Sequence, residues 1–219
     1  CMALCGEVER PARPIVAVQQ VGDVSLRNLT LRGPAIGIRA LNLTGPLHLQ
    51  GISIEDHLLA GLEVDSGSGG SVNLEFVSFR DFNNPPESLA SNSYRTAASI
   101  IHWGGFIEGH HLAFAPTKST GLHLATAEAQ ASGTNWILQN ELSELPPPGE
   151  LSLGNNTPDG IYLTGGSLSL DGYAAFNPGF GGVHSFFGGG QVNLANAWID
   201  GAEVGTLVSN MDIQMSKTV

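Results

Sequence analysis

Basic residues are scarce in this sequence. Its 219 residues include nine Lys and Arg against 20 Asp and Glu, which gives a formal net charge of −11 at neutral pH. Binding to nucleic acid depends on clustered Lys and Arg that neutralise phosphates, and the few basic residues here are dispersed along the chain. The composition therefore argues against nucleic acid, and against an anionic membrane surface, as a partner.

Long apolar runs are also missing. No run approaches the roughly 20 residues that a membrane-spanning helix needs, so we expect no transmembrane segment. Hydrophobic residues nevertheless make up 42% of the chain and charged residues only 13%, the reverse of the composition of disordered proteins. We therefore expect a folded chain with a hydrophobic core.

Cysteine is limited to Cys1 and Cys5, so no disulfide can cross-link the body of the fold. The sequence starts at Cys1 rather than at Met, which leaves two interpretations open. In the first, Cys1 is the lipid anchor of a bacterial lipoprotein whose signal peptide was removed. In the second, the sequence starts at an arbitrary point of a longer chain.

Glycine and proline are abundant, with 29 and 12 residues, which is typical of a turn-rich β protein. Glycine opens a short apolar stretch at regular intervals along the chain. These stretches begin at Gly37, Gly61, Gly121, Gly160 and Gly182, with a weaker copy at Ala98. Neighbouring copies are about 23 residues apart, except where two longer intervals each contain about 15 extra residues, and such a period indicates a repeat architecture.

A second pattern repeats in step with the first. Each copy has two short segments of alternating apolar and polar residues, which is typical of strands with one buried face. The copies cover residues 24–31, 47–54, 72–79, 107–114, 131–138, 168–175 and 192–199. The inward positions predict stacks of like residues, such as Leu26, Leu49, Leu74, Leu170 and Leu194.

The joint between the two segments carries the most specific signal. Its second residue is, copy by copy, Asn28, Gly51, Phe76, His111, Asn135, Gly172 and Asn196. Five of these seven residues are Asn or Gly, the types that tolerate the left-handed backbone of a sharp bend. The joint is therefore predicted to be a tight corner between two strands.

Three short strands per repeat with one tight corner are typical of a coil of a parallel β-helix. In these features the chain resembles the pectate-lyase-like β-helix superfamily, which implies a right-handed coil and agrees with the crossover rule for parallel strands. We predict an all-β fold with an extended segment over residues 1–13 and a right-handed parallel β-helix, a solenoid of about eight coils, over residues 14–219. A sandwich or jelly roll is the alternative, but it does not require a constant repeat length.

Two insertions interrupt the repeat, near residues 83–97 and 140–159, and both are expected at the same edge of the helix. They would flank the outward residues of the glycine-led strands, where the superfamily resemblance implies that an elongated substrate lies. This candidate ligand-binding stripe consists of Arg39, Glu63, Asp65, His123, Tyr162 and His184, with Ile101 or His102 at the weak copy. His and Tyr suit sugar rings and hydroxyls, although an ordinary solvated surface has the same composition.

Neither a metal nor a cofactor is predicted. His123 and His184 are two coils apart, which at about 4.8 Å per strand is too far to share a zinc ion, and calcium lacks clustered carboxylates. Catalytic residues cannot be assigned either. A lyase needs a base such as Arg39, a hydrolase needs paired carboxylates such as Glu63 and Asp65, and the glycosidase motifs of the superfamily are missing.

The sequence thus predicts an extracellular or cell-surface module, secreted or anchored, that is structural, binds carbohydrate, or both. It is expected to be part of a larger chain or assembly, because the last segment still alternates like a strand and no cap follows it. Two alternatives stay open. One is a polysaccharide lyase or glycoside hydrolase acting in the groove between the insertions, and the other is a structural subunit that stacks end to end on another protein domain.

Overall fold

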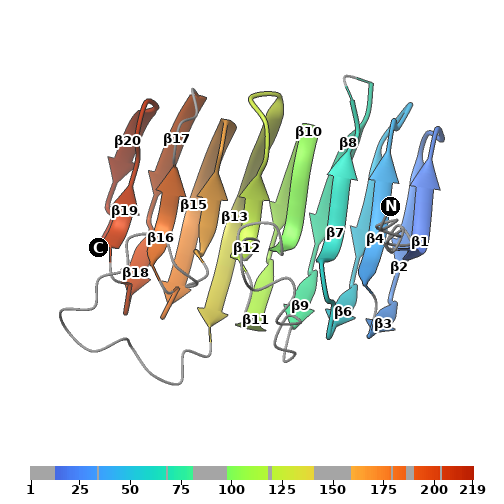
Figure 1. Cartoon of the computed structure of the whole chain (residues 1–219), viewed down its shortest axis with the longest axis horizontal. Helices are drawn as coiled ribbons and strands as arrows, with labels where there is room; N and C mark the ends of the chain where they lie inside the picture. The colour runs from blue at the N-terminus through green and yellow to red at the C-terminus, as the bar shows by residue number, and fades with distance from the viewer. Residues whose placement is uncertain are drawn as a thin grey trace, which may run out of the picture.

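The fold is an all-β parallel solenoid, seen in a computed structural model that describes residues 13–33, 35–67, 69–80, 98–117, 120–140, 159–178, 180–185, 190–202 and 204–219. These ranges contain twenty strands and no helix, and hence no helix with the length and apolar character of a membrane span. The strands follow one another along the long axis from the N-terminal to the C-terminal end (Figure 1). The predicted all-β parallel solenoid is therefore confirmed, while its right-handed sense and its eight coils stay predictions.

Three parallel faces surround the interior. The first face contains β1 (Pro14–Gln19), β4 (Ile36–Leu41), β7 (Ala60–Asp65), the first half of β10 (Ala98–His110), β12 (Thr120–Leu124), β14 (Ile161–Leu163), β16 (Gly181–Ser185) and β19 (Val204–Leu207). The second face contains β2 (Val24–Arg27), β5 (Leu47–Gln50), β8 (Ser71–Glu75), the second half of β10, the first halves of β13 (Ala129–Asn140) and β15 (Gly166–Phe176), β17 (Gly190–Ala195) and β20 (Asp212–Ser216). The third face contains β3 (Thr30–Arg32), β6 (Ser53–Glu55), β9 (Ser78–Arg80), β11 (Ala113–Thr117), the second halves of β13 and β15, and β18 (Trp198–Asp200).

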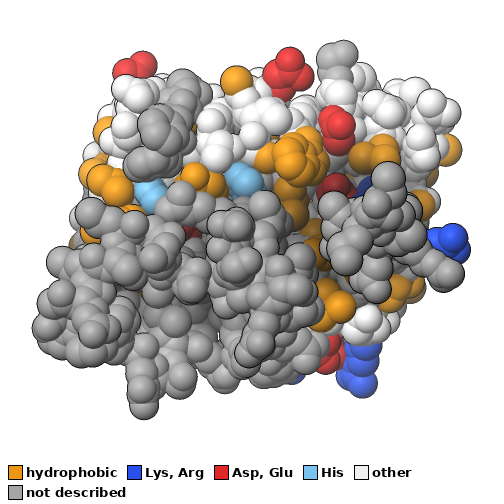
Figure 2. Space-filling view, in the orientation of Figure 1, with side chains coloured by type: hydrophobic (Ala, Val, Ile, Leu, Met, Phe, Trp, Pro, Cys, Tyr) orange, Lys and Arg blue, Asp and Glu red, His pale blue; other side chains and the backbone are white. Residues whose placement is uncertain are grey.

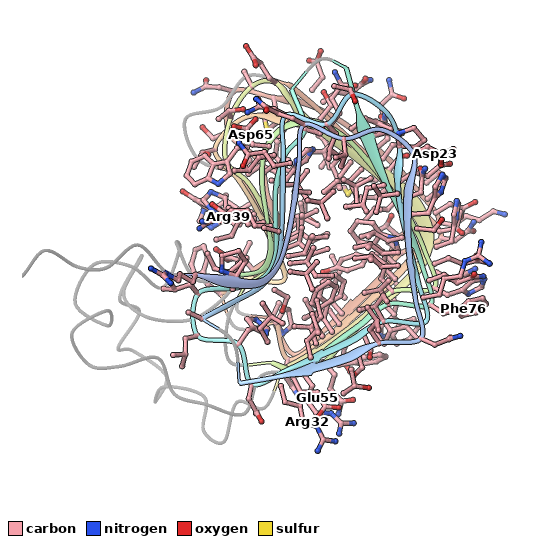
Figure 3. The ribbon with its side chains drawn as sticks, turned by 90° about the vertical axis from the view of Figure 1, so that its right-hand side faces the viewer. Asp23, Arg32, Arg39, Glu55, Asp65 and Phe76 are labelled. Atoms are coloured by element: carbon pink, nitrogen blue, oxygen red, sulfur yellow. The ribbon has the colours of Figure 1, made fainter. Side chains whose placement is uncertain are left out.

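The view along the axis shows these faces as three sides of one tube (Figure 3). Arg39 and Asp65 mark the first face, Asp23 and Phe76 mark the two edges of the second, and Arg32 marks the third. Each strand pairs in parallel with the strand one turn later, and hydrogen bonds of side chains across this step join residues 22 to 25 apart in sequence. A turn thus takes about 24 residues, close to the predicted repeat of about 23.

The backbone of the second corner residue is left-handed in every copy. The φ angles of the seven corner residues lie between 50° and 77°, in the region that glycine and asparagine tolerate best. Phe76 and His111 also adopt this conformation, with φ of 53° and 57°. Their rings stack with centroids 4.8 Å apart and planes 4° from parallel, and this contact offsets part of the backbone strain.

The predicted leucine ladder is present but interrupted. Leu26, Leu49 and Leu74 pair in register, and so do Leu170 and Leu194. Between these two runs, the same ladder continues through two glycines, Gly109 and Gly133.

Trp136 explains the interruption. Its side chain is fully buried, and its Nε1–H donates to the carbonyl oxygen of Gly109 at 2.8 Å. A Cβ atom on Gly133 would lie 2.5 Å from that nitrogen, so any larger residue would displace the indole. The two glycines therefore make room for one large side chain.

Packing also explains why glycine recurs near the start of the first-face strands. The first face approaches the third so closely that a Cβ on Gly61 would lie 2.5 Å from Cδ1 of Phe79, and one on Gly37 would lie 2.8 Å from Cγ2 of Ile54. Because contacts between carbon atoms are normally about 3.5–4.0 Å long, only glycine fits there. The recurrent glycine is thus imposed by the core.

The interior is open at the last described turn. Ile213 and Met215 continue two inward ladders, yet they are 39% and 52% exposed. End-to-end stacking nevertheless stays a prediction. The expected N-terminal segment, apart from Arg13, and residues 81–97 and 141–158 of the two insertions lie outside the described residues.

Candidate functional site

The predicted stripe forms a continuous ladder on the outer side of the first face. Its register partners, turn by turn, are Arg39, Glu63, Ile101, His123, Tyr162 and His184. Ile101 therefore takes the position that the sequence left open between Ile101 and His102. Asp65 follows Glu63 by two residues, lies on the same side and is exposed (Figure 3).

His102 faces the interior instead. Its side chain is fully buried, and Nε2 lies 3.1 Å from the carbonyl oxygens of both Gly105 and Gln130. Burial lowers the pKa of His102, so the neutral ring, with its proton on Nε2, fits this position. The ring ties the corner after the first face to the next turn.

The N-terminal part of the stripe is occupied by an ion pair. Arg39 Nε and Glu63 Oε2 are 2.5 Å apart, and the two side chains are 26% and 20% exposed. Glu63 is therefore engaged across the turn by Arg39. It does not form with Asp65 the isolated pair of carboxylates that a hydrolase needs.

The C-terminal part of the stripe is buried. His123, Tyr162 and His184 are 8%, 4% and 2% exposed. The centroid of the Tyr162 ring lies 5.1 Å from that of His123 and 5.3 Å from that of His184, and the centroid of the Phe180 ring lies 4.9 Å from that of His184. Figure 2, which views the first face, shows histidine among hydrophobic side chains here. These three stripe residues are thus part of a packed aromatic row.

A buried carboxylate completes this row. Asp159 Oδ2 lies 3.1 Å from His184 Nδ1, and Oδ1 accepts the backbone N–H of Gly181 at 3.1 Å. Asp159 and His184 have side chains that are 3% and 2% exposed. A carboxylate that holds Nδ1 fixes the orientation of an imidazole, which is how acid–base histidines are positioned. Sequence reasoning missed Asp159 because it falls at the end of the second insertion; its position directly before a glycine-led strand was the available signal.

An open groove lies on a different side of the molecule, along the second face. Two ladders of outward side chains, most of them polar, run along it. The first is Ser25, His48, Asn73, Glu108, Ser132, Ser169, Asn193 and Gln214, and the second is Arg27, Gln50, Glu75, His110, Thr134, Asp171, Ala195 and Ser216. Sequence reasoning treated these residues only as the polar half of an alternating pattern.

The hollows on this face join into one groove. A cavity of about 500 Å³ extends from Glu108 to Ser216, and a second of about 380 Å³ extends from Asp23 to the same Glu108. Both are also lined by His110, so the two hollows meet at the middle of the solenoid. The groove therefore follows the axis over most of the described second face.

An aromatic ledge borders the groove at its centre. Phe76 and His111 directly follow Glu75 and His110 in sequence, at the corner where the second face ends (Figure 3). Their stacked rings are solvent-accessible, and Phe76 is 56% exposed. A flat ring beside polar groups is suited to contact one face of a sugar.

The described residues contain no group of three or more His, Cys, Asp or Glu that could hold a metal ion. No family model, curated protein or solved structure is significantly similar to this chain. The resemblance to the pectate-lyase-like superfamily therefore depends on the repeat and corner residues alone.

Proposed function

We propose that this chain is an extracellular or cell-surface module that binds polysaccharide along the groove of the second face. The observation that carries the proposal is the continuity of the groove. Strands about 4.8 Å apart present a new pair of side chains at every turn, so the groove is a linear, periodic surface. A linear polymer of repeating sugars is the ligand that such a surface fits.

The chemistry of the lining supports the same ligand. Amide, hydroxyl and carboxylate groups alternate along the two ladders, and together they donate to and accept from sugar hydroxyls. The ledge of Phe76 and His111 adds an apolar face for a sugar ring. We further propose a right-handed coil and membership of the pectate-lyase-like superfamily, which the 24-residue turn and the left-handed corners support.

The proposal places the polymer on the second face rather than on the predicted stripe. Three of the six stripe residues, His123, Tyr162 and His184, are at most 8% exposed, whereas the groove is open. Arg39, Glu63 and Asp65 are more accessible and stay candidates for ligand contacts on the first face.

A steric block in the groove tests the proposal. Ser132 points outward at the centre of the groove, and Ser78 points outward on the third face with a similar, intermediate exposure. In affinity electrophoresis against a panel of neutral, cationic and acidic polysaccharides, the wild-type chain should be retarded by at least one polymer. Ser132→Tyr should abolish that retardation, and Ser78→Tyr should retain it. Wild-type mobility that no polymer changes, or equal loss in both variants, would overturn the proposal.

A second candidate, a polysaccharide lyase or glycoside hydrolase, is favoured by one observation. The Asp159–His184 pair has the arrangement of an oriented acid–base histidine. The same polymers, followed for unsaturated products and new reducing ends with and without calcium, test this candidate. Product formation that Asp159→Asn removes would support an enzyme. The absence of products from every polymer would exclude the enzyme and leave the binding function as the proposal.

A further inference from the structure

Acidic side chains outnumber arginine and lysine in the groove. Asp23, Glu75, Glu108 and Asp171 line its two hollows, and Arg27 is the one Lys or Arg among the lining residues, which also include His48 and His110. The larger hollow, from Glu108 onward, has two carboxylates and no Lys or Arg in its lining.

Within the described residues, the side-chain partners of these carboxylates are amides and histidines. Glu75 Oε2 accepts from Gln50 Nε2 at 2.8 Å, and Asp171 Oδ1 accepts from Asn196 Nδ2 at 2.6 Å. Glu108 Oε1 lies 3.4 Å from His110 Nε2. The groove carboxylates are thus held in place by hydrogen bonds, while no guanidinium or ammonium group within the described residues forms an ion pair with them.

Two carboxylates on the other faces form ion pairs with arginine. Glu55 pairs with Arg32 at 2.8 Å on the third face, and Glu63 pairs with Arg39 on the first. The chain has only nine Lys and Arg, and Arg27 is the one that lines the groove, so acidic side chains outnumber them there.

This charge selects the ligand. A polymer of uronic acids carries one negative charge on each sugar and would meet like charge along the groove. A polymer with ammonium groups would instead supply the missing cations to carboxylates that are already oriented. We propose that the groove binds a polysaccharide of amino sugars with free amines. This inference rests on the proposed function and names its substrate class.

Phe76 points to the same class independently of the carboxylates. Its ring is 56% exposed, and its neighbour in the preceding turn of the corner stack is Gly51, which has no side chain to cover it. An ammonium group above an exposed aromatic ring is attracted by the ring quadrupole. Because Glu75 precedes Phe76 directly, one ammonium group could contact both a carboxylate and a ring.

Three oligosaccharides of equal length test the inference by calorimetry on the whole chain at neutral pH, where histidine adds no formal charge and part of the amines is protonated. They are oligomers of glucosamine, of N-acetylglucosamine and of galacturonic acid, and the last is measured with and without calcium. The glucosamine oligomer should bind most tightly. Its affinity should fall as salt is added, because exposed charges are screened beyond about 10 Å at 0.1 M ionic strength.

Variants that replace carboxylates by neutral amides show which carboxylates contribute to the affinity. Glu75→Gln combined with Glu108→Gln should weaken glucosamine binding about fivefold at low salt, the loss expected for two exposed ion pairs. Glu128→Gln combined with Asp200→Asn removes the same charge outside the two groove hollows and should leave the affinity unchanged.

The outcomes separate the inference from the proposed function. Tighter binding of the galacturonate oligomer, with or without calcium, would overturn the inference and leave polysaccharide binding standing. Equal weakening by both double variants would also overturn it, because the charge would then act from the whole surface. Failure of every polymer in the wider panel would overturn the proposed function itself.

Discussion

Two neighbouring glycines on the first face offer a direct test of the packing. Gly182 and Gly205 occupy the same ladder one turn apart, because Gly181 pairs with Val204 and Val183 with Thr206. A Cβ on Gly182 would lie 2.5 Å from Ile199 Cγ2 and 2.7 Å from the carbonyl oxygen of Gly205, whereas a Cβ on Gly205 would meet nothing within 4 Å. The same substitution should therefore have opposite effects at the two positions.

Gly182→Ala should lower the free energy of unfolding by about 1–3 kcal/mol, the usual effect of overpacking a core. Ile199 can shift only partly, and the carbonyl of Gly205 belongs to the backbone of β19. Gly205→Ala should range from neutral to about 1 kcal/mol stabilising, because alanine restricts the unfolded chain. Adding Ile199→Ala to Gly182→Ala should recover part of the loss, since the two side chains compete for one space.

Urea unfolding followed by circular dichroism measures these differences, and thermal unfolding checks them at about 2–4 °C per kcal/mol for a chain of this size. Equal destabilisation by the two alanines would show that the register of β16 and β19 is wrong. Two neutral alanines would show that the first face does not pack closely against the third.

Three further predictions concern buried polar groups. Trp136→Phe should destabilise the fold by about 1–3 kcal/mol, measured by the same unfolding experiment, because the carbonyl of Gly109 loses its donor inside the core. Asp159→Ala should cost about 3–5 kcal/mol by leaving His184 buried without its carboxylate, and a loss below 1 kcal/mol would contradict the observed pairing. Burial lowers the pKa of His57 from 6.5 to about 4. The unfolded chain then binds a proton that the folded chain does not, so stability should fall by about 3 kcal/mol between pH 6.5 and 4, and His57→Leu should remove this part of the pH dependence.

Sequence periodicity predicted the strand register, apart from the choice between Ile101 and His102, for physical reasons. Each turn stacks on an identical position of its neighbour, so an apolar residue or a left-handed corner must recur at the same offset. This constraint is strong enough that Ile107 pairs with Ala131 and Leu168 with Val192, which are the first residues of the predicted copies. It is also strong enough to hold Phe76 in a left-handed conformation that its residue type disfavours.

Periodicity could not reveal how side chains of different size share the interior. The replacement of leucine by glycine at Gly109 and Gly133 makes sense only once Trp136 is known to lie across them. An alternating pattern shows which side of a strand a residue occupies, not the volume that its neighbours need. Long-range packing decided this part of the core.

Outward positions were the least predictable, because alternation says nothing of what lies against the outer side of a strand. His123 and His184 were expected on a stripe that faces a ligand, yet they are 8% and 2% exposed. Asp159, 25 residues before His184, is responsible for part of this environment. The open surface is on the second face, whose residues had no catalytic or binding motif to draw attention to them.

The position of the groove follows from a difference between the outward side chains of the first and second faces. On the first face, glycine brings the strand against the third face, and the outer side chains pack in rows or pair as Arg39 and Glu63 do. On the second face, the outward residues bond to one another across the turns, as Gln50 and Glu75 do, and line an open groove. Glu75 and Glu108 can therefore stay acidic without destabilising the core. A surface whose composition the core does not dictate is where selection for a ligand can act, and this is why the second face is the better place to look for the function of this chain.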